Sequence, residues 1–302
     1  IESDLLKKSI IPLFIIFFLL LILVPIVGIE VKGAKRWLDL YFFRLQPIEI
    51  LKPFFVLMTS TILLSKSQKV SNSSYGVSFL ILLSIVIFLI NQPDVGQSIL
   101  LIGTWISIVF ISGIAIFYIL GFFVSFTISV SSLLYFFPEK FGYITKRLVT
   151  FMDPSKGDSF QSGKALDAIR QGGLKGQGMG EGILKDRVPE AHTDYIIAVI
   201  TEEFGSIISI FIVGIFLYIT YRIIKICVQT NDDNIKITLS GLSSLLIFQT
   251  FIHIGVNTSL LPTTGMTLPF LSYGGSSLLG SAVLAGVILN YTKNKVNKEV
   301  YD

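Results

Sequence analysis

The chain has 302 residues, of which 52% are apolar and only 15% are charged, and its mean hydropathy is +0.75. A soluble domain carries about 25% charged residues. The charge deficit therefore excludes a soluble fold, and the apolar content excludes disordered and collagen-like chains. The net charge of +4 comes from basic residues scattered between apolar runs, which does not favour nucleic-acid binding. The single cysteine excludes a disulfide scaffold.

The apolar residues gather in separate runs, each close to the length of about 20 residues that crosses a bilayer. The pattern predicts an all-α, polytopic membrane helix bundle, with the whole chain, 1–302, forming one integral-membrane domain. A large loop, 138–191, interrupts the bundle. Within it, 163–170 is predicted to form a short helix that Gly172 and Gly173 end. The eight predicted spans are 10–29, 47–65, 75–91, 95–112, 115–137, 193–222, 235–258 and 276–291.

The distribution of Lys and Arg predicts the orientation of these spans. The side that holds both termini has ten basic residues, whereas the opposite side has five outside the long loop and nine within it. Because short cytoplasmic segments are enriched in Lys and Arg, we expect both termini to be cytoplasmic and the long loop to be extracytoplasmic.

A polar cluster ending in Thr193 and Asp194 leads directly into an apolar run. Either side chain is a good N-cap, because its oxygen can accept an unpaired backbone N–H. Alternatively, the positive end of the helix dipole keeps Asp194 ionised, so that it accepts a proton at the membrane–water boundary. The residues alone leave both interpretations open.

Two acids, Glu202 and Glu203, follow within the same predicted span. Glu202 is eight residues after Asp194, which would place it on the same helix face and about 12 Å deeper. Acids within membrane helices are costly and usually face the bundle interior or a wet cavity. These side chains either line a cavity or form structural hydrogen bonds, and the sequence leaves both interpretations open. His253 is either a partner for one acid or a core histidine.

A cluster of cations surrounds the start of the second predicted span, where Arg36, Arg44 and Lys52 occur. Basic side chains at an interface commonly extend to phospholipid head groups. Lys52 differs, because it lies inside an apolar run and needs an anion or water there. The planar guanidinium of arginine suits phosphate oxygens. The cluster therefore predicts a pyrophosphate-binding site.

Two further segments are rich in helix-breaking residues. Segment 172–182 holds six glycines, which favours close backbone approach to a ligand or to the bundle. Segment 262–277 is broken by prolines and glycines, and irregular backbone at membrane depth is tolerated where it is buried or lines a cavity. The second segment alone fits a transporter equally well.

Together these motifs resemble one family, the shape, elongation, division and sporulation (SEDS) proteins, and are most similar to its cell-division members, followed by its elongation members. The matching segments occur in family order across nearly the whole chain. They are 32–37 (KGAKRW), 45–49 (LQPIE), 92–96 (QPDVG), 189–194 (PEAHTD) and 269–276 (PFLSYGGS).

The resemblance implies a ten-helix glycosyltransferase that polymerises lipid II into peptidoglycan, of which the first two helices would precede this chain. It implies Asp194 as the catalytic residue. Lipid II, membrane lipids, a class B penicillin-binding protein and other division proteins are the implied partners, at the septum of the bacterial cytoplasmic membrane. No cofactor is certain, although Mg²⁺ or Mn²⁺ fits the chemistry. The implied substrate-binding residues are Asp186, Glu190 and His192 besides the cations, and the implied cavity-lining residues are Gln46 and Ser272 besides Glu202 and Glu203.

The sequence departs from the family pattern at Ile48 and Gln171, where serine is usual. Two other functions remain open at this stage. One is a lipid II transporter, or flippase, whose intramembrane charges line a path. The other is a non-catalytic scaffold of the division machinery.

Overall fold

The computed structural model describes residues 3–31, 33–64, 70–153, 155, 160–188 and 190–301, so Lys32 and Pro189 of the motifs lie outside the described residues. The chain divides into two compact units. Unit 1 comprises Ile1–Gly113, Leu217–Phe248 and Tyr273–Asp302, and unit 2 comprises Ile114–Phe216 and Gln249–Ser272.

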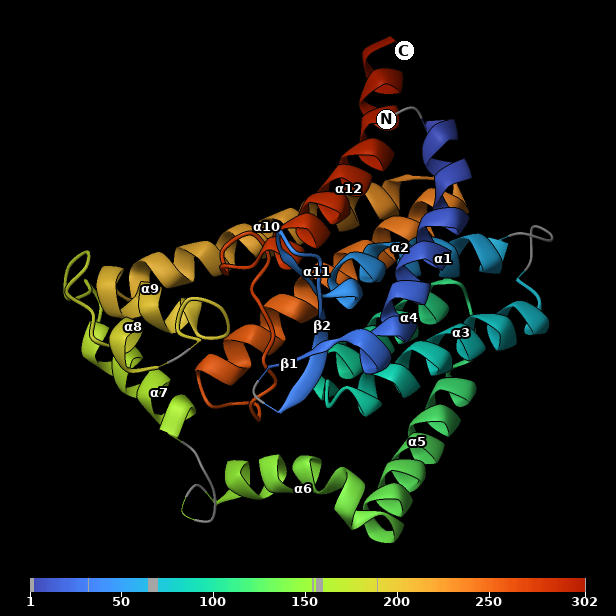
Figure 1. Ribbon diagram of the computed structural model, residues 1–302. Helices are drawn as coiled ribbons and strands as arrows, with labels where there is room; N and C mark the ends of the chain where they lie inside the picture. Colours follow the sequence, from blue (N-terminus) through green and yellow to red (C-terminus); the bar gives the residue numbers. More distant parts are fainter. Residues whose placement is uncertain are drawn as a thin grey trace. The chain divides into compact units, whose positions relative to one another are not determined.

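Unit 1 is a helix bundle organised around α2 (Pro47–Leu64) (Figure 1). In the span formed by α2, 78% of the residues are buried, whereas in the span formed by α1 only 22% are buried. The helices that pack most extensively against α2 are α1 (Ser3–Val27), α3 (Asn72–Asn91), α4 (Val95–Ile111) and α12 (Gly275–Tyr301).

Glycines allow the neighbouring helices to approach α2 closely. A Cβ at Gly280 of α12 would lie 2.3 Å from the carbonyl oxygen of Glu49 in α2. At Gly241, in α11 (Asp233–Asn257), it would lie 2.7 Å from side-chain atoms of Val56 and Ile108. Small residues at helix contacts are typical of membrane bundles, where dispersion contacts replace the hydrophobic effect as the driving force.

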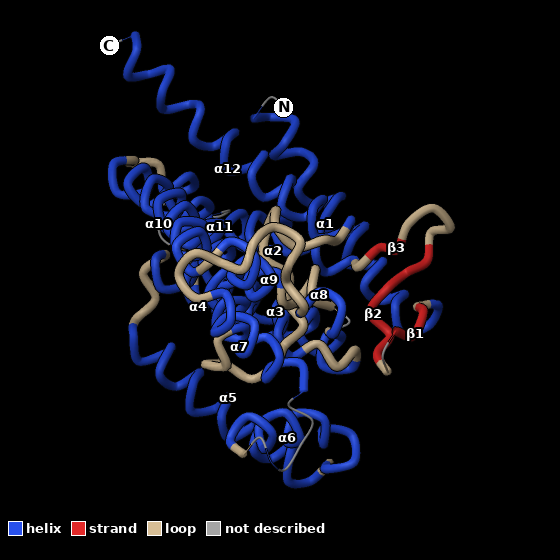
Figure 2. Tube along the Cα trace, turned by 90° about the vertical axis from the view of Figure 1, so that its left-hand side faces the viewer, coloured by secondary structure: helices blue, strands red, loops and turns tan. Residues whose placement is uncertain are grey.

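A three-stranded antiparallel sheet lies between α1 and α2 in the sequence, with strand order β1-β2-β3 (Figure 2). The strands are β1 (Ile29–Val31), β2 (Ala34–Asp39) and β3 (Arg44–Leu45), and Val31 pairs with Ala34 and Asp39 with Arg44. The sequence analysis did not anticipate these strands.

Both ends of the chain belong to unit 1, where α1 begins and α12 ends at the end of the unit away from the sheet (Figure 1). Helix α1 runs towards the sheet, because β1 follows it directly. Helix α12 runs away from the sheet, since Ser276 in its first turn bonds to Arg44 and Gln46.

Unit 2 contains the predicted long loop, 138–191, whose described residues form α6 (Pro138–Met152), α7 (Phe160–Gly172) and α8 (Leu184–Arg187). The unit also contains α5 (Ile116–Phe136) and α9 (Ile196–Phe204). The predicted short helix is confirmed as α7, which ends at Gly172 and is followed by Gly173 at φ +53°. Helices α7 and α8 both pack against α9.

The predicted continuous span 193–222 is wrong, because the structure forms two helices there. Helix α9 ends at Phe204 and α10 (Ser206–Gln229) begins after Gly205, whose φ is +86°. A Cβ at Gly205 would also lie 2.2 Å from the carbonyl oxygen of Leu174. In the described residues, seven helices are long and apolar enough to cross a membrane and the apolar α4 is shorter. The polytopic all-α class is therefore confirmed.

The glycine-rich segment wraps the C-terminal end of α9. The N–H of Gln177 donates to the carbonyl of Glu202 at 2.9 Å, and that of Gly178 to Glu203 at 3.0 Å. A Cβ at Gly172 or Gly176 would lie 2.0 or 2.2 Å from a carbonyl oxygen of α9. The sequence left two interpretations of these glycines, close approach to a ligand or close approach to the bundle. The structure shows close approach to another segment of the same chain, α9.

We predict that Gly172→Ala destabilises unit 2, because its Cβ would meet the Thr201 carbonyl at 2.0 Å and force α7 away from α9. The cost is at least about 1–3 kcal/mol, as for other overpacked sites. Thermal unfolding of the detergent-solubilised protein measures it. The matched control is Gly163→Ala in the same helix, where nothing lies within 4 Å of the new Cβ. Equal unfolding temperatures for both variants would contradict the close contact.

Candidate active site

Asp194 lies in a tight turn that leads into α9. The carbonyl of Glu190 accepts from the backbone N–H groups of Thr193, Asp194 and Tyr195 at 3.1, 3.0 and 3.3 Å. The Thr193 hydroxyl also donates to Oε2 of Glu190 at 2.6 Å. Glu190 itself has φ +96°. Such a conformation is strained for a residue with a side chain, and strain of this kind clusters at functional sites.

The predicted N-cap of this helix is wrong. The N-cap position is occupied by Tyr195, which makes no side-chain cap bond. Instead, Oδ1 of Asn257, at the end of α11, accepts from the N–H of Ala198 at 3.2 Å. An amide side chain in the last turn of an apolar helix was the sequence signal for this capping role of Asn257. The sequence analysis missed that signal.

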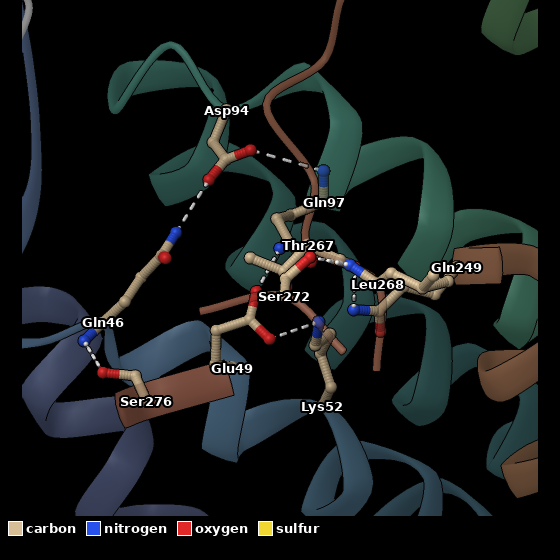
Figure 3. A network of polar contacts seen from close by, with 10 residues as sticks. All are labelled: Gln46, Glu49, Lys52, Asp94, Gln97, Gln249, Thr267, Leu268, Ser272 and Ser276. Atoms are coloured by element: carbon tan, nitrogen blue, oxygen red, sulfur yellow. Dashed lines mark hydrogen bonds and ion pairs between the residues drawn. The ribbon is translucent and has the colours of Figure 1, made fainter. Parts of the chain in front are cut away.

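Two side chains hold successive carbonyls of the Asp194 turn. Nδ2 of Asn257 donates to the carbonyl of Asp194 at 3.0 Å, and the hydroxyl of Ser272 donates to that of Thr193 at 2.6 Å. Ser272 accepts in turn from the N–H of Leu268 at 2.7 Å (Figure 3). The backbone of the turn is therefore fixed from outside, while the Asp194 side chain is half-buried.

The segment that carries Ser272 is itself tied to α11. Nε2 of Gln249 donates to the carbonyl of Thr267 at 2.9 Å, and Nδ1 of His253 lies 2.7 Å from that of Met266. The predicted irregular stretch 262–277 is irregular backbone from 262 to 274, whereas its last three residues begin α12. His253 is a buried core histidine that fixes this stretch, and no contact with Glu202 or Glu203 is found among the described residues.

Tyr195 follows the carboxylate and is buried. Burial raises the pKa of its phenol to about 12, and the negative charge of Asp194 acts in the same direction. The Tyr195 hydroxyl therefore stays neutral near pH 7. Among the neighbouring residues of this turn, Asp194 and Glu190 carry the carboxylates, and Glu190 is bound by Thr193.

In unit 2, Glu202 has a structural set of bonds. It is 1% exposed, and its two oxygens accept from the N–H groups of Ile183 and Leu184 at 2.9 and 3.0 Å. Glu203 is partly exposed and lies 3.4 Å from Nζ of Lys185. Glu202 therefore holds the glycine-rich segment against α9. Two other predicted site residues, Asp186 and His192, are exposed.

In unit 1, the start of α2 forms a buried polar network (Figure 3). Nζ of Lys52 lies 2.8 Å from Oε2 of Glu49, and Nε2 of Gln97 donates to Oε1 of Glu49 at 2.5 Å. Nε2 of Gln46 donates to Asp94 at 3.3 Å. Glu49 and Gln97, which the sequence analysis did not select, are thus central to this network.

The three predicted pyrophosphate ligands differ in what they contact. Lys52 is 2% exposed, and its anion is Glu49 of its own helix. The Arg36 guanidinium donates to the carbonyls of Gln92 and Pro93 and lies 3.9 Å from Asp94. Arg44 is exposed, and its guanidinium has no partner in the described part of the chain. Arg44 is therefore the cation of this set that is open to an anionic ligand.

Asp94 is fully buried at the start of α4, where its side chain accepts from the N–H of Gln97. Burial raises the pKa of the Asp94 carboxyl above its ordinary value, and the nearby Arg36 guanidinium opposes that shift. This pair joins β2 to the connection between α3 and α4.

A protein-bound metal centre is not formed by the described residues, since no group of three or more His, Cys, Asp or Glu is placed to hold an ion. Magnesium is commonly held by one or two carboxylates together with phosphate oxygens of a substrate. A cation at Asp194 would therefore need to be held by this carboxylate together with phosphate oxygens of a substrate.

Comparison with known proteins bears on this arrangement. The family model FTSW_RODA_SPOVE, described as cell cycle protein, matches residues 1–297. The probable peptidoglycan glycosyltransferase FtsW of Caulobacter vibrioides is 35% identical over 269 residues, which cover 89% of this chain and 68% of the relative.

Solved structures share the fold. A peptidoglycan synthase complex has a chain with TM-score 0.80 and 24% identity, and the match covers 97% of this chain and 83% of that one. A variant of the rod shape determining protein RodA of Thermus thermophilus gives TM-score 0.67 and 25% identity, with 96% and 80% covered.

The fold and the polar clusters define a polytopic membrane protein whose buried charges are held by its own helices. The chain belongs to the FtsW/RodA/SpoVE family of cell cycle proteins, so the predicted SEDS resemblance is confirmed.

We predict that Glu202→Gln destabilises the protein by about 1–3 kcal/mol, because the amide nitrogen would leave one buried N–H without an acceptor. Thermal unfolding in detergent measures the loss. Glu203→Gln is the matched control, since its partly exposed ion pair with Lys185 contributes about 0–1 kcal/mol. A Glu202→Gln protein as stable as wild type would indicate a cavity-lining acid instead.

Proposed function

We propose that this chain is a peptidoglycan glycosyltransferase that polymerises lipid II into glycan strands during septal cell-wall synthesis, with Asp194 as general base. Membership of the family supports the activity, as do relatives named probable peptidoglycan glycosyltransferase FtsW. The observation that carries the role of Asp194 is its turn, in which two successive carbonyls are bound by Ser272 and Asn257.

The proposed reaction transfers the growing chain to a new lipid II molecule. Asp194 accepts the proton of the 4-hydroxyl of the acceptor GlcNAc as that oxygen attacks the anomeric carbon of MurNAc. A new glycosidic bond forms, the bond from that carbon to the pyrophosphate oxygen breaks, and undecaprenyl pyrophosphate leaves with both electrons. General-base catalysis needs the base within hydrogen-bond reach of the proton that it accepts, and the two bonds that fix the backbone of the Asp194 turn support such positioning.

We assign stabilisation of the leaving pyrophosphate first to Arg44, because its guanidinium is exposed. Arg36 and Lys52 remain proposed contributors, and their internal partners give them a supporting role in holding β2 and α2. Asp186, Glu190 and His192 are proposed substrate contacts near Asp194. Ser272 is proposed to line the substrate cavity in unit 2, and Gln46 is proposed as a cavity-lining residue of unit 1.

We propose that both termini are cytoplasmic and that the protein acts at the division septum of the bacterial cytoplasmic membrane. The beginning of α1 and the end of α12 lie at the same end of unit 1, which supports placing both termini on one side (Figure 1). The proposed partner is a class B penicillin-binding protein, with other division proteins around it. The structural neighbour comes from a peptidoglycan synthase complex that coordinates polymerization and crosslinking, which supports a partner that carries out crosslinking.

The decisive experiment is polymerisation of purified lipid II by the detergent-solubilised protein with its penicillin-binding partner. Asp194→Asn is expected to lower the rate by about 10²–10⁴-fold, the usual contribution of a general base. Detergent removes membrane sidedness, so a flippase has no reaction to perform there.

Asp167→Asn is the matched control, because this exposed carboxylate on α7 pairs only with Lys164, at 3.6 Å, among the described residues. It makes the same change of charge and is expected to keep the wild-type rate. Wild-type polymerisation by Asp194→Asn would refute the catalytic assignment. Absence of glycan strands with every variant, wild type included, would favour the transporter or the scaffold.

We further propose that a divalent cation, Mg²⁺ or Mn²⁺, assists by binding the substrate pyrophosphate. Chelation with EDTA is then expected to lower the polymerisation rate, and added Mg²⁺ or Mn²⁺ to restore it. The measurement is glycan-strand formation across a cation titration. An unchanged rate in EDTA would exclude this cofactor.

A further inference from the structure

The turn between β2 and β3 projects from the strands (Figure 2), and four consecutive apolar side chains of this turn are exposed. Leu40 and Phe43 are 42% and 48% exposed, and Tyr41 and Phe42 are 92% and 89% exposed. Single exposed apolar residues are ordinary. An exposed run of this length calls for a partner that covers it.

The turn is a defined structure. The N–H of Leu40 donates to the carbonyl of Phe43 at 3.1 Å, and the N–H of Tyr41 donates to Oδ1 of Asp39 at 3.0 Å. The rings of Tyr41 and Phe42 meet edge to face, with centroids 5.3 Å apart. Tyr41 has φ +68°, a conformation that favours glycine or asparagine over a bulky residue. The aromatic rings are thus displayed at a conformational cost.

The base of this hairpin lies where three apolar helices begin or end. Helix α1 ends at Val27 just before β1, and α2 begins at Pro47 just after β3. The hydroxyl of Ser276, in the first turn of α12, donates to the carbonyl of Arg44 at 3.1 Å and accepts from the N–H of Gln46 at 2.9 Å. The base is therefore fixed at the boundary of the membrane-spanning segments.

The short reach of the turn keeps it near that boundary. Tyr41 is three residues from Arg44, so its backbone extends at most about 10 Å from the base. The head-group layer on each side of the hydrocarbon core is about 5–8 Å thick. Aromatic side chains at this distance reach the layer in which Tyr and Trp are enriched in membrane proteins.

The exposed charges of the hairpin are balanced. Lys35 and Arg44 are basic and Glu30 and Asp39 are acidic, and the strand register places Glu30 opposite Lys35 and Asp39 opposite Arg44. Basic side chains beside apolar ones are typical of segments that lie at the head groups, where the ammonium or guanidinium meets lipid phosphate.

We infer that the turn 40–43 inserts into the interfacial layer of the bilayer on the side where α1 ends, and so anchors the hairpin to lipid. The occupant of the exposed aromatic surface is phospholipid, not another protein. This inference does not depend on the proposed reaction, because it concerns a contact that the resting protein makes.

Site-specific fluorescence in nanodiscs tests the insertion. In a Cys227→Ala background, Phe42→Cys is labelled with the polarity-sensitive fluorophore NBD, and the full chain is reconstituted with phosphatidylethanolamine and phosphatidylglycerol. Lipids with a doxyl quencher near the head group should quench this label more strongly than lipids with the quencher at mid-chain, and aqueous iodide should quench it weakly. Lys175→Cys, at an exposed position of the glycine-rich segment, serves as the reference site.

A blue-shifted label at position 42 that is quenched by the shallow doxyl lipid supports the inference. Quenching by iodide as strong as for free label would overturn it. Protection from both quenchers would also overturn it, since this result indicates a protein cover. Unfolding temperatures of the labelled proteins in the same nanodiscs verify that each variant is folded.

Discussion

The amide of Asn257 is the interaction on which the candidate active site depends. It donates to the Asp194 carbonyl and accepts from the Ala198 N–H, so it completes the start of α9 and fixes the preceding turn at once. Unpaired backbone groups at a helix end are costly when buried. Because Asn257 meets this need from α11, the N-cap position makes no side-chain bond of its own, and Asp194 can be oriented by its backbone.

In unit 2, close contacts between backbone segments stabilise the arrangement of the helices, as polar side chains also do. Gly172, Gly176 and Gly205 all lie where a Cβ would collide with a carbonyl oxygen. The glycine-rich segment can therefore bond directly to the end of α9, and Glu202 binds the N–H groups at its far end. Helix α9, which follows the strained Glu190 turn, is therefore bound by other segments at both its first and its last turn.

The sequence predicted what depends on local composition. Apolar runs located the spans, and Gly172 with Gly173 located the end of α7, because both signals lie within one stretch of chain. It did not predict the break at Gly205, where the positive φ of the glycine coincides with close approach of Leu174, which is distant in the sequence. The capping role of Asn257 was also missed, because Asp194 and Ala198 are distant from it in the sequence. The motif resemblance implies catalysis by Asp194, whereas spacing alone could not separate capping from catalysis.

The partners of the charges in α2 also escaped the sequence analysis, although one of them is local. Lys52 was predicted to need an anion or water, and Glu49, one turn earlier in the same helix, supplies the anion. The strands of the hairpin were missed because the six residues of β2 combine charges with aromatics and show no clean alternation.

The Glu49–Lys52 pair has a consequence for how this protein enters a bilayer. Both charges are on one helix, three residues apart, so they neutralise each other before α3, α4 or α12 has been synthesised. The high cost of transferring a lone charge into hydrocarbon is thereby reduced for α2 during its insertion by the translocation machinery. Gln97 belongs to a later span and can join Glu49 only once α4 has followed, so assembly of the network proceeds in the order in which the ribosome delivers its members.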